Sequence, residues 1–414
     1  MARSTPRRRA EKPRRWSRRK SPAPAAARSG PSRIVAAPPP PVPAPAPDPS
    51  TEPAPTPVPS TPAPPPARDP APPTEPVIQP PPEPTSPSRV RVRAWATLWL
   101  LLTLAGAAAL GAGVVGWGPE ILPEAGAVVV AATYVWALAA RTGGRPVVFG
   151  LLTLAVGGAI LLTDRELLRN GGAVMVCAIS AILAVVATVP AVKTRTAVRE
   201  VLVAMVVAAL GGLAAAGLQP SIDFARFEYL TLGMALFGGL VVVYRLGAGL
   251  HGLGRRGLLL VLVGGVVLAL TLAYGELLRR YGTPALVENV NDGIFWLRDH
   301  AGASPRPIVA VLGIPALMWG VHMRARRRQG WWVCVFGVVA TAPVAQAFLQ
   351  PSVSLEEWSL ALGYGVLVGL VLGLVLIRVD VALTGGRSSR GRRGRRAEEA
   401  AALRPEPSRI DSLL

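Results

Sequence analysis

From Ala94 onward the chain repeats one pattern, in which an apolar run is followed by a short polar or glycine-rich stretch. A helix that crosses a hydrocarbon core of about 30 Å needs roughly 20 apolar residues. Lipid offers the backbone no water to bond, so such runs fold as helices. They lack the period-two alternation of barrel strands. The predicted spans are 94–117, 122–140, 146–163, 173–192, 201–218, 229–247, 257–274, 308–323, 331–349 and 359–377.

The regions flanking these runs are polar. Thirty of the 43 prolines precede residue 90, and 38–87 contains stretches such as PPPPVPAPAPDP. Such sequence favours extended polyproline II segments and cannot bury a core. We therefore predict an all-α fold, a polytopic helical membrane bundle of about ten transmembrane helices. It comprises a disordered basic and Pro/Ala-rich tail over 1–88, a transmembrane domain over 89–380 and an Arg-rich tail over 381–414.

Basic residues predict the orientation of the bundle, because cytoplasmic loops carry an excess of Lys and Arg. Twelve basic residues lie in the four predicted inner loops and seven in the outer loops, which include the long loop 275–307. An even number of spans then places both termini in the cytoplasm. Eight of the ten tryptophans lie near predicted span ends, where aromatic rings favour the membrane interface. With three lysines among 44 basic residues, the composition is typical of a GC-rich bacterial genome, and we predict the inner membrane.

The formal net charge of +20 is concentrated in the tails and in loops beside apolar runs. That distribution disfavours nucleic acid and favours the anionic headgroups of the bilayer at the cytoplasmic face. Six arginines follow the last span: Arg387, Arg390, Arg392, Arg393, Arg395 and Arg396. The Pro-rich tail can dock a protein partner or act as a passive tether, and the sequence leaves both alternatives open. It also leaves the oligomeric state open.

Motifs that carry chemistry are missing from the sequence. Cys177 and Cys334 lie in separate apolar runs, and no Cys/His cluster has the spacing of a zinc site. Asp299-His300 in the outer loop is explained more simply by surface polarity than by catalysis. His322 is expected at the inner membrane interface. We predict no catalytic residue, no cofactor and no metal.

The spans contain almost no ionisable groups in their interiors, and five such residues are expected at span edges, where their side chains reach water: Glu124, Glu228, Glu276, Arg245 and Asp380. Proton-coupled transporters and ion pumps place such groups at mid-depth, so this distribution disfavours a charge-driven mechanism.

The outer loop 275–307 contains one further predicted element. Thr283-Pro284 is typical of a helix start, with proline at the first helical position. Leu286, Val290 and Ile294 then recur on one face. The loop therefore predicts an amphipathic helix lying on the outer membrane surface.

Prolines inside the eighth and ninth predicted spans mark a candidate polar path. Pro315 and Pro343 interrupt backbone hydrogen bonding, and Thr341 and Gln346 lie beside the second of them. A kink beside polar side chains can line a cavity, or neighbouring helices can satisfy the freed groups.

The last predicted span repeats small residues at Gly365, Gly369 and Gly373. This spacing lets another helix approach closely. Packing within the chain is favoured over self-association, because a ten-helix bundle has many internal interfaces.

Three functions are compatible with this pattern. The small number of charges expected inside the spans and the two long tails favour a non-enzymatic envelope scaffold or regulatory protein that binds partners or anionic lipid through its tails. The alternative is a transporter or permease for a small or lipidic substrate. An enzyme acting on a lipid-linked substrate has the least support.

Overall fold

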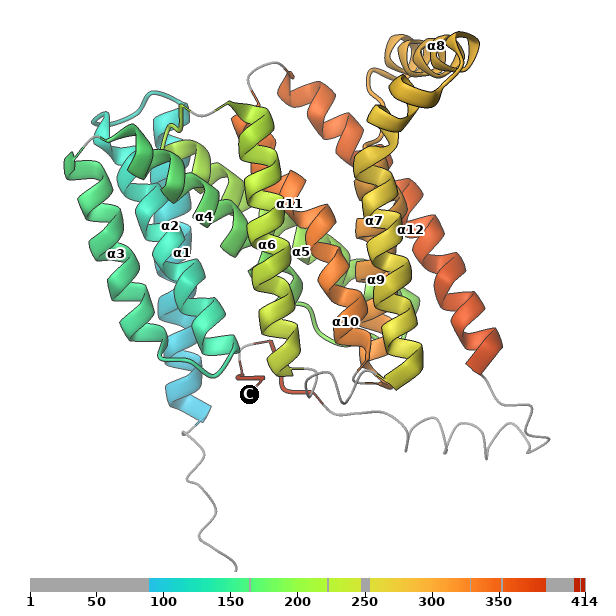
Figure 1. The fold of residues 1–414 in the computed structure, drawn as a ribbon. Helices are drawn as coiled ribbons and strands as arrows, with labels where there is room; N and C mark the ends of the chain where they lie inside the picture. Colours follow the sequence, from blue (N-terminus) through green and yellow to red (C-terminus); the bar gives the residue numbers. More distant parts are fainter. Residues whose placement is uncertain are drawn as a thin grey trace, which may run out of the picture. The chain divides into compact units, whose positions relative to one another are not determined.

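The computed structural model describes residues 89–163, 165–221, 223–246, 254–327, 329–350, 353–384, 406–409 and 411–413. The predicted tail over 1–88 lies outside these residues, as do residues 385–405 of the second tail. The described part of the chain is helical and contains no strand (Figure 1). Nine of its helices are long and apolar enough to cross a membrane. The remaining predicted span, 308–323, falls on a shorter apolar helix, Ile308–Arg324. The number of spans that cross the bilayer stays a prediction.

The first half of the bundle consists of six helices. They are α1 (Arg89–Val114), α2 (Ile121–Arg141), α3 (Pro146–Thr163), α4 (Glu166–Val186), α5 (Thr194–Gly217) and α6 (Phe224–Leu246).

The second half is less regular. Its elements are α7 (Gly254–Tyr281), α8 (Pro284–Ala301), the π-helical turn η2 (Ile308–Gly313), α9 (Ile314–Arg324), α10 (Gly330–Cys334), the 3₁₀ turn η3 (Val335–Gly337), α11 (Val338–Gln346), the 3₁₀ turn η4 (Ala347–Leu349) and α12 (Leu355–Thr384).

Local chemistry explains where these helices begin and end. The side chain of Thr283 accepts a hydrogen bond from the Leu286 backbone N–H at 3.3 Å, and Pro284 occupies the first turn of α8. The predicted helix start at Pro284 is therefore confirmed. By contrast, α4 begins at Glu166 and ends at Val186, not at 173 and 192. Pro190 disfavours helical backbone in the preceding Val189, whose N–H instead donates to Glu200.

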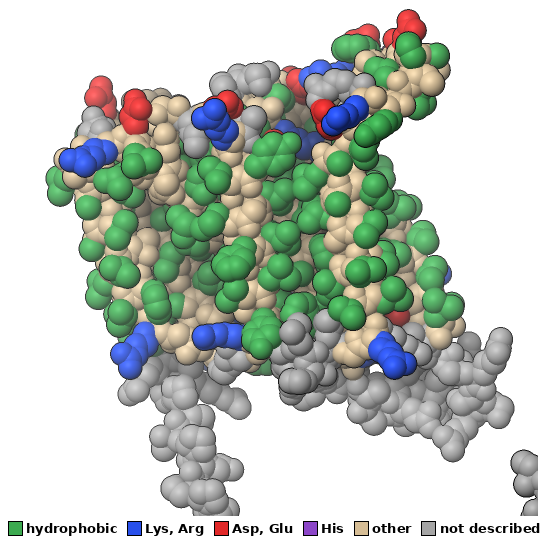
Figure 2. Space-filling view, viewed as in Figure 1, with side chains coloured by type: hydrophobic (Ala, Val, Ile, Leu, Met, Phe, Trp, Pro, Cys, Tyr) green, Lys and Arg blue, Asp and Glu red, His purple; other side chains and the backbone are tan. Residues whose placement is uncertain are grey.

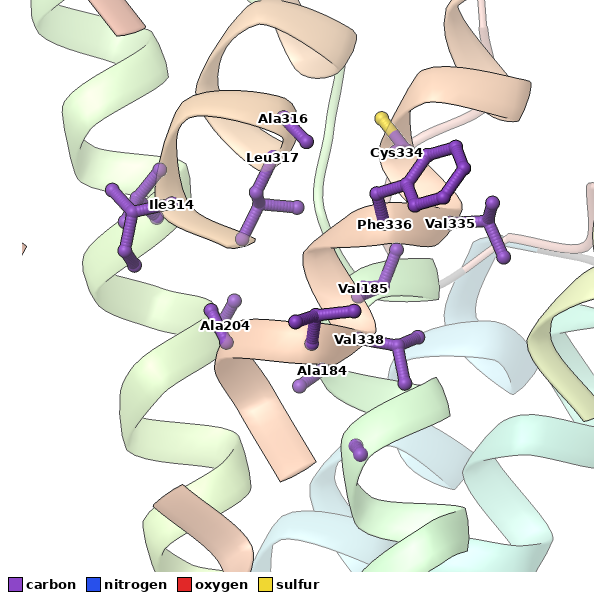
Figure 3. Packing of buried hydrophobic residues seen from close by; sticks show 14 of the residues in the cluster. Ala184, Val185, Ala204, Ile314, Ala316, Leu317, Cys334, Val335, Phe336 and Val338 are labelled. Carbon is purple, nitrogen blue, oxygen red and sulfur yellow. The ribbon is translucent and has the colours of Figure 1, made fainter. Parts of the chain in front are cut away.

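The centre of the bundle is the run α10–η3–α11, which contacts α4, α6 and α9 and has α5 alongside α11. It is the most deeply buried of the membrane-length runs. Figure 3 shows its Cys334, Val335 and Val338 among residues of α4, α5 and α9. This cluster forms one core, and a second cluster joins α2, α4 and the end of α5.

Outside this core the helices turn apolar side chains outward. Leu151, Leu262 and Leu367 are each at least 60% exposed, and apolar side chains cover the flank of the bundle in Figure 2. A water-soluble protein rarely exposes an apolar area of this size, whereas a membrane protein presents it to lipid. The chain is thus a membrane-embedded helical protein.

Several tryptophans do not lie where the sequence suggested. Trp331, Trp332 and Trp358 are buried at 2%, 5% and 8% exposure. For these three the prediction of an exposed interfacial ring is wrong, because their span ends are covered by other parts of the chain. Trp95 and Trp117 are exposed at 47% and 73%.

Candidate functional site

Two interrupted helices cross in the core beside a cavity. The first is η2–α9, which opens with a π-helical turn and carries Pro315 at its start. The second is α10–η3–α11, with 3₁₀ turns at both ends of α11 and Pro343 inside it. A Cβ added to Gly313 would lie 2.5 Å from the backbone nitrogen of Ala340, so the two helices touch backbone to backbone. Interruptions of this kind are frequent at functional sites.

The cavity beside them has a volume of about 230 Å³ and lies between α6, α7, η2 and α11. Its apolar wall includes Leu232, Leu272 and Ile308. Its polar groups include Glu228, Arg306 and Gln346. Both α6 and α7, which line the cavity, also carry exposed apolar side chains such as Phe237 and Leu262.

An ion pair forms the polar edge of this cavity. Arg306 Nη1 lies 3.5 Å from Glu228 Oε1, and the two side chains are 28% and 37% exposed. Arg306 also donates from Nη2 to Gln350 Oε1 at 2.6 Å. The pair is long and partly solvated, so its net contribution to stability is small and each partner can exchange for another charge.

Gln346 provides the buried polar group of the cavity. Its side chain is 1% exposed, and Nε2 donates to the Glu228 backbone oxygen at 3.4 Å. Gln346 Oε1 has no hydrogen-bond partner among the described residues. A buried amide oxygen without a partner is costly, and a donor from a bound molecule would satisfy it.

The four residues of the predicted polar path do not lie together. Pro343 and Gln346 both line the cavity. Thr341 is fully buried and points to α4, where its hydroxyl donates to the Ala181 oxygen at 3.0 Å. Pro315 is buried in the first turn of α9. Thr341 and Pro315 are therefore packing residues in this structure.

The glycines of α12 lie against η2 and α9 of the same chain. A Cβ at Gly369 would lie 2.5 Å from Cβ of Ile314, and one at Gly373 would lie 2.8 Å from Sδ of Met318. Gly365 faces Val309 at 3.4 Å. These distances require residues without a side chain at Gly369 and Gly373.

Asp299 and His300, the polar pair of the outer loop, lie on the exposed surface of α8. His300 Nδ1 lies 2.8 Å from the Trp296 oxygen, and the two rings stack. Among the described residues, no three His, Cys, Asp or Glu side chains are grouped closely enough to hold a metal ion. Cys177 and Cys334 are free and buried.

Sequence reasoning missed Arg306 in the cavity. Its signal was its position, directly before Pro307 and the apolar run at 308, on the side where the topology prediction expects few basic residues. In the structure Arg306 pairs with Glu228 at this boundary.

The opposite end of the bundle holds buried charged groups that the sequence did not single out. Arg141, His322 and Arg324 are 4%, 4% and 0% exposed, and Glu200 is 1% exposed. His322, expected at the membrane interface, has a buried side chain whose Nδ1 lies 3.0 Å from the Ala191 oxygen. Each of these four residues sits at a helix end that other elements cover, including the C-terminal segment Glu406–Leu413.

Comparison of the chain with protein-family models, with curated proteins and with solved structures finds no match. Functional interpretation therefore rests on the geometry of the two ends of the bundle.

Proposed function

We propose that the protein is a membrane carrier that takes up a small zwitterionic molecule, or the zwitterionic headgroup of a lipid, at the cavity between α6, α7 and α11. The observation that carries this proposal is the combination of the Glu228–Arg306 pair with the unpartnered amide oxygen of Gln346 in one cavity. This proposal corresponds to the transporter or permease, the alternative to a scaffold among the functions compatible with the sequence.

The size of the cavity limits the ligand. Pockets that enclose a whole drug-sized ligand measure roughly 300–1,000 Å³, and this cavity measures about 230 Å³. It therefore suits a small molecule or a headgroup whose acyl chains remain outside. Leu232 and Leu272 line it on α6 and α7, and the exposed apolar side chains of these two helices give the acyl chains a surface in lipid.

The charges select the chemistry of the ligand. A phosphate can replace Glu228 on the Arg306 guanidinium, and an ammonium can replace Arg306 on the Glu228 carboxylate. An N–H or O–H of the ligand can donate to Gln346 Oε1. A phosphoethanolamine headgroup has all of these features.

The interrupted helices favour a carrier over a purely structural bundle. Transporters build substrate sites from discontinuous helices, whose free backbone groups and bistable packing allow movement. Here η2–α9 and α10–η3–α11 supply Ile308, Pro343 and Gln346 to the cavity. A scaffold that only anchors its tails has no need of such breaks.

A scaffold or regulatory protein is the second candidate function. Its support is the described C-terminal segment, which folds back onto the bundle and contacts α2, α5 and α9. Binding of anionic lipid or of a protein partner by the tails belongs to this candidate.

We also propose that the end carrying Arg141 and Arg324 faces the cytoplasm of a bacterial inner membrane. Figure 2 shows Lys and Arg side chains at both edges of this face, whereas the Asp and Glu side chains lie mostly along its upper edge, so the lower edge carries the excess of basic groups that the basic-residue rule expects inside. Reporter fusions after residues 143 and 290 test this orientation. A cytoplasmic signal at 290 would reverse it.

The carrier proposal is tested in phosphatidylcholine vesicles that contain a trace of fluorescent phosphatidylethanolamine. The rate at which labelled lipid changes leaflet is measured by dithionite quenching. Glu228→Gln and Arg306→Gln are each expected to reduce the protein-dependent rate by about tenfold or more, since a hydrogen bond to a charged group contributes roughly 1.5–3 kcal/mol.

Glu124→Gln is the matched control. Glu124 pairs with Arg169 at 2.8 Å, and neither residue lines the cavity. The rate of lipid movement in the Glu124→Gln protein should equal that of the unmodified protein. Equal rates for Glu228→Gln, Arg306→Gln and Glu124→Gln, or labelled phosphatidylglycerol moving as fast as phosphatidylethanolamine, would count against a zwitterionic site.

A further inference from the structure

Four polar side chains are buried together at the end of the bundle away from α8. Arg141, Thr188, Glu200 and Arg324 are 4%, 0%, 1% and 0% exposed. Arg141 lies on α2, Thr188 follows the end of α4, Glu200 lies on α5 and Arg324 lies on α9. Four separate parts of the fold therefore meet there. Burying charges is unfavourable unless each has an opposite charge or several hydrogen bonds.

The helices themselves satisfy these groups only in part. Arg324 donates from Nη1 to Thr188 Oγ1 at 2.8 Å, and its guanidinium lies 3.4 Å above the ring of Trp331. Glu200 accepts from the Val189 backbone N–H at 2.9 Å and pairs with Arg199, which is 67% exposed. A second hydrogen bond runs from Arg324 Nη2 to the Thr188 backbone oxygen at 3.2 Å, so these contacts of Arg324 with the bundle are all to uncharged groups.

The C-terminal segment Glu406–Leu413 provides the opposite charges. Glu406 Oε2 lies 2.7 Å from Arg324 Nη2, and both side chains are nearly inaccessible at 5% and 0%. Arg409 Nη2 lies 2.6 Å from Glu200 Oε2. An acidic and a basic side chain of the segment therefore meet a basic and an acidic side chain of the bundle.

A turn in the segment binds the remaining guanidinium. The Asp411 N–H donates to the Ser408 oxygen at 3.1 Å, and the Ser408 hydroxyl donates to the Asp411 carboxylate at 2.6 Å. Both backbone oxygens accept from Arg141 Nη1, at 2.6 Å for Asp411. The Leu413 N–H donates back to the Arg141 oxygen at 2.8 Å.

We propose that this end of the bundle is a peptide-binding site whose ligand is the chain's own C-terminal segment Glu406–Leu413. The segment acts as an intramolecular lock. It ties α2, which belongs to one hydrophobic cluster, to α5 and α9, which contribute to the other. The site is specific for an acidic residue followed three positions later by an arginine and a turn.

The tether explains why the lock closes within one chain. Only residues 385–405 separate α12 from the segment, and Figure 1 has the C-terminus beside the same end of the bundle as the last turn of α12. A short linker gives a tethered ligand a millimolar effective concentration. The segment can therefore bind the bundle weakly and reversibly and still occupy the site most of the time.

A truncated protein and a synthetic peptide test the site directly. Protein ending at residue 405 is placed in nanodiscs, and a fluorescent peptide of residues 403–414 is added while its anisotropy is recorded. Saturable binding is expected, with binding to the full chain at least about tenfold weaker because the tethered segment competes. Peptides carrying Glu406→Gln or Arg409→Glu should lose about tenfold in affinity, as expected for charge-assisted hydrogen bonds.

A second measurement uses the full chain and changes only the tail, so that it stays informative if the truncated protein does not fold. Trypsin cleavage after Arg409 is followed by mass spectrometry. Glu406→Gln should raise the cleavage rate by about tenfold, because opening of the lock exposes the bond. Glu398→Gln, a tail carboxylate outside the described segment, is the control.

Two results would overturn the proposal. One is equal cleavage after Arg409 in the unmodified protein, in Glu406→Gln and in Glu398→Gln, together with no binding of the peptide. The other is a loss of oligomeric mass on truncation, because the segment would then dock on a second copy. Neither readout uses a lipid ligand, so failure of the lock and failure of the carrier proposal are distinguishable.

Discussion

Two Glu–Arg pairs lie at opposite ends of one bundle, and their surroundings give them different roles. Glu228 and Arg306 are 3.5 Å apart and roughly a third exposed, beside a cavity. Glu406 and Arg324 are 2.7 Å apart and almost completely buried, beneath a segment that closes the end of the fold. The first pair is reached by solvent, so the proposed ligand can replace either partner. The second pair is shielded from water and separates only when the whole C-terminal segment leaves the bundle, as in the proposed lock.

The sharpest way to break this comparison is to remove the buried guanidinium. Arg324→Ala leaves Glu406 buried without its counter-charge and removes the hydrogen bond to Thr188. A loss of about 3–5 kcal/mol in the free energy of unfolding is expected. Thermal unfolding in detergent measures it. Arg326→Ala, two positions after Arg324 in the exposed turn that follows α9, should change little.

The glycines of α12 test the packing between the two ends. Gly369→Ala places a methyl group 2.5 Å from Cβ of Ile314, which should lower stability by about 1–3 kcal/mol. Gly363→Ala on the same helix meets nothing within 4 Å and should be neutral or raise stability by up to about 1 kcal/mol. Similar effects of the two changes on the unfolding temperature would contradict the observed α9–α12 contact.

Substitutions at Thr341 and Gln346 distinguish a packing role from a ligand-binding role within α11. Thr341→Val removes the hydroxyl that donates to the Ala181 oxygen and leaves that oxygen buried, so about 1–3 kcal/mol of stability should be lost. Lipid movement per folded molecule should stay unchanged, whereas Gln346→Leu should reduce it. A transport defect in Thr341→Val, at normal folded yield, would extend the polar path beyond the cavity.

The smallest effect on stability is expected at the cavity itself. Glu228→Gln breaks a partly exposed ion pair and should change the free energy of unfolding by less than about 1 kcal/mol. The main effect of Glu228→Gln should be a lower affinity for the ligand. Destabilisation as large as that of Arg324→Ala would make the two pairs equivalent and remove the basis of the comparison.

The sequence predicted the parts of the candidate site that depend on local signals. Pro343 and Gln346 could be selected because a proline and a polar amide stand out in an apolar run. Their partners could not, because Arg306 and Glu228 come from different helices and each reads as an ordinary residue at a span end. Thr341, only two positions from Pro343, points to α4 instead, since neighbouring residues on a helix face different directions.

The sequence by itself determined the fold class, the positions of the apolar helices and the start of α8, because hydropathy, helix length and capping are properties of neighbouring residues. Only the tertiary structure decided which end-of-span charges are buried. The contacts that bury them join residues 82, 209 and 270 positions apart, in the pairs Arg324–Glu406, Glu200–Arg409 and Arg141–Asp411. No pattern along the chain encodes such pairings, because they exist only after the helices have packed and the C-terminal segment has folded back onto them.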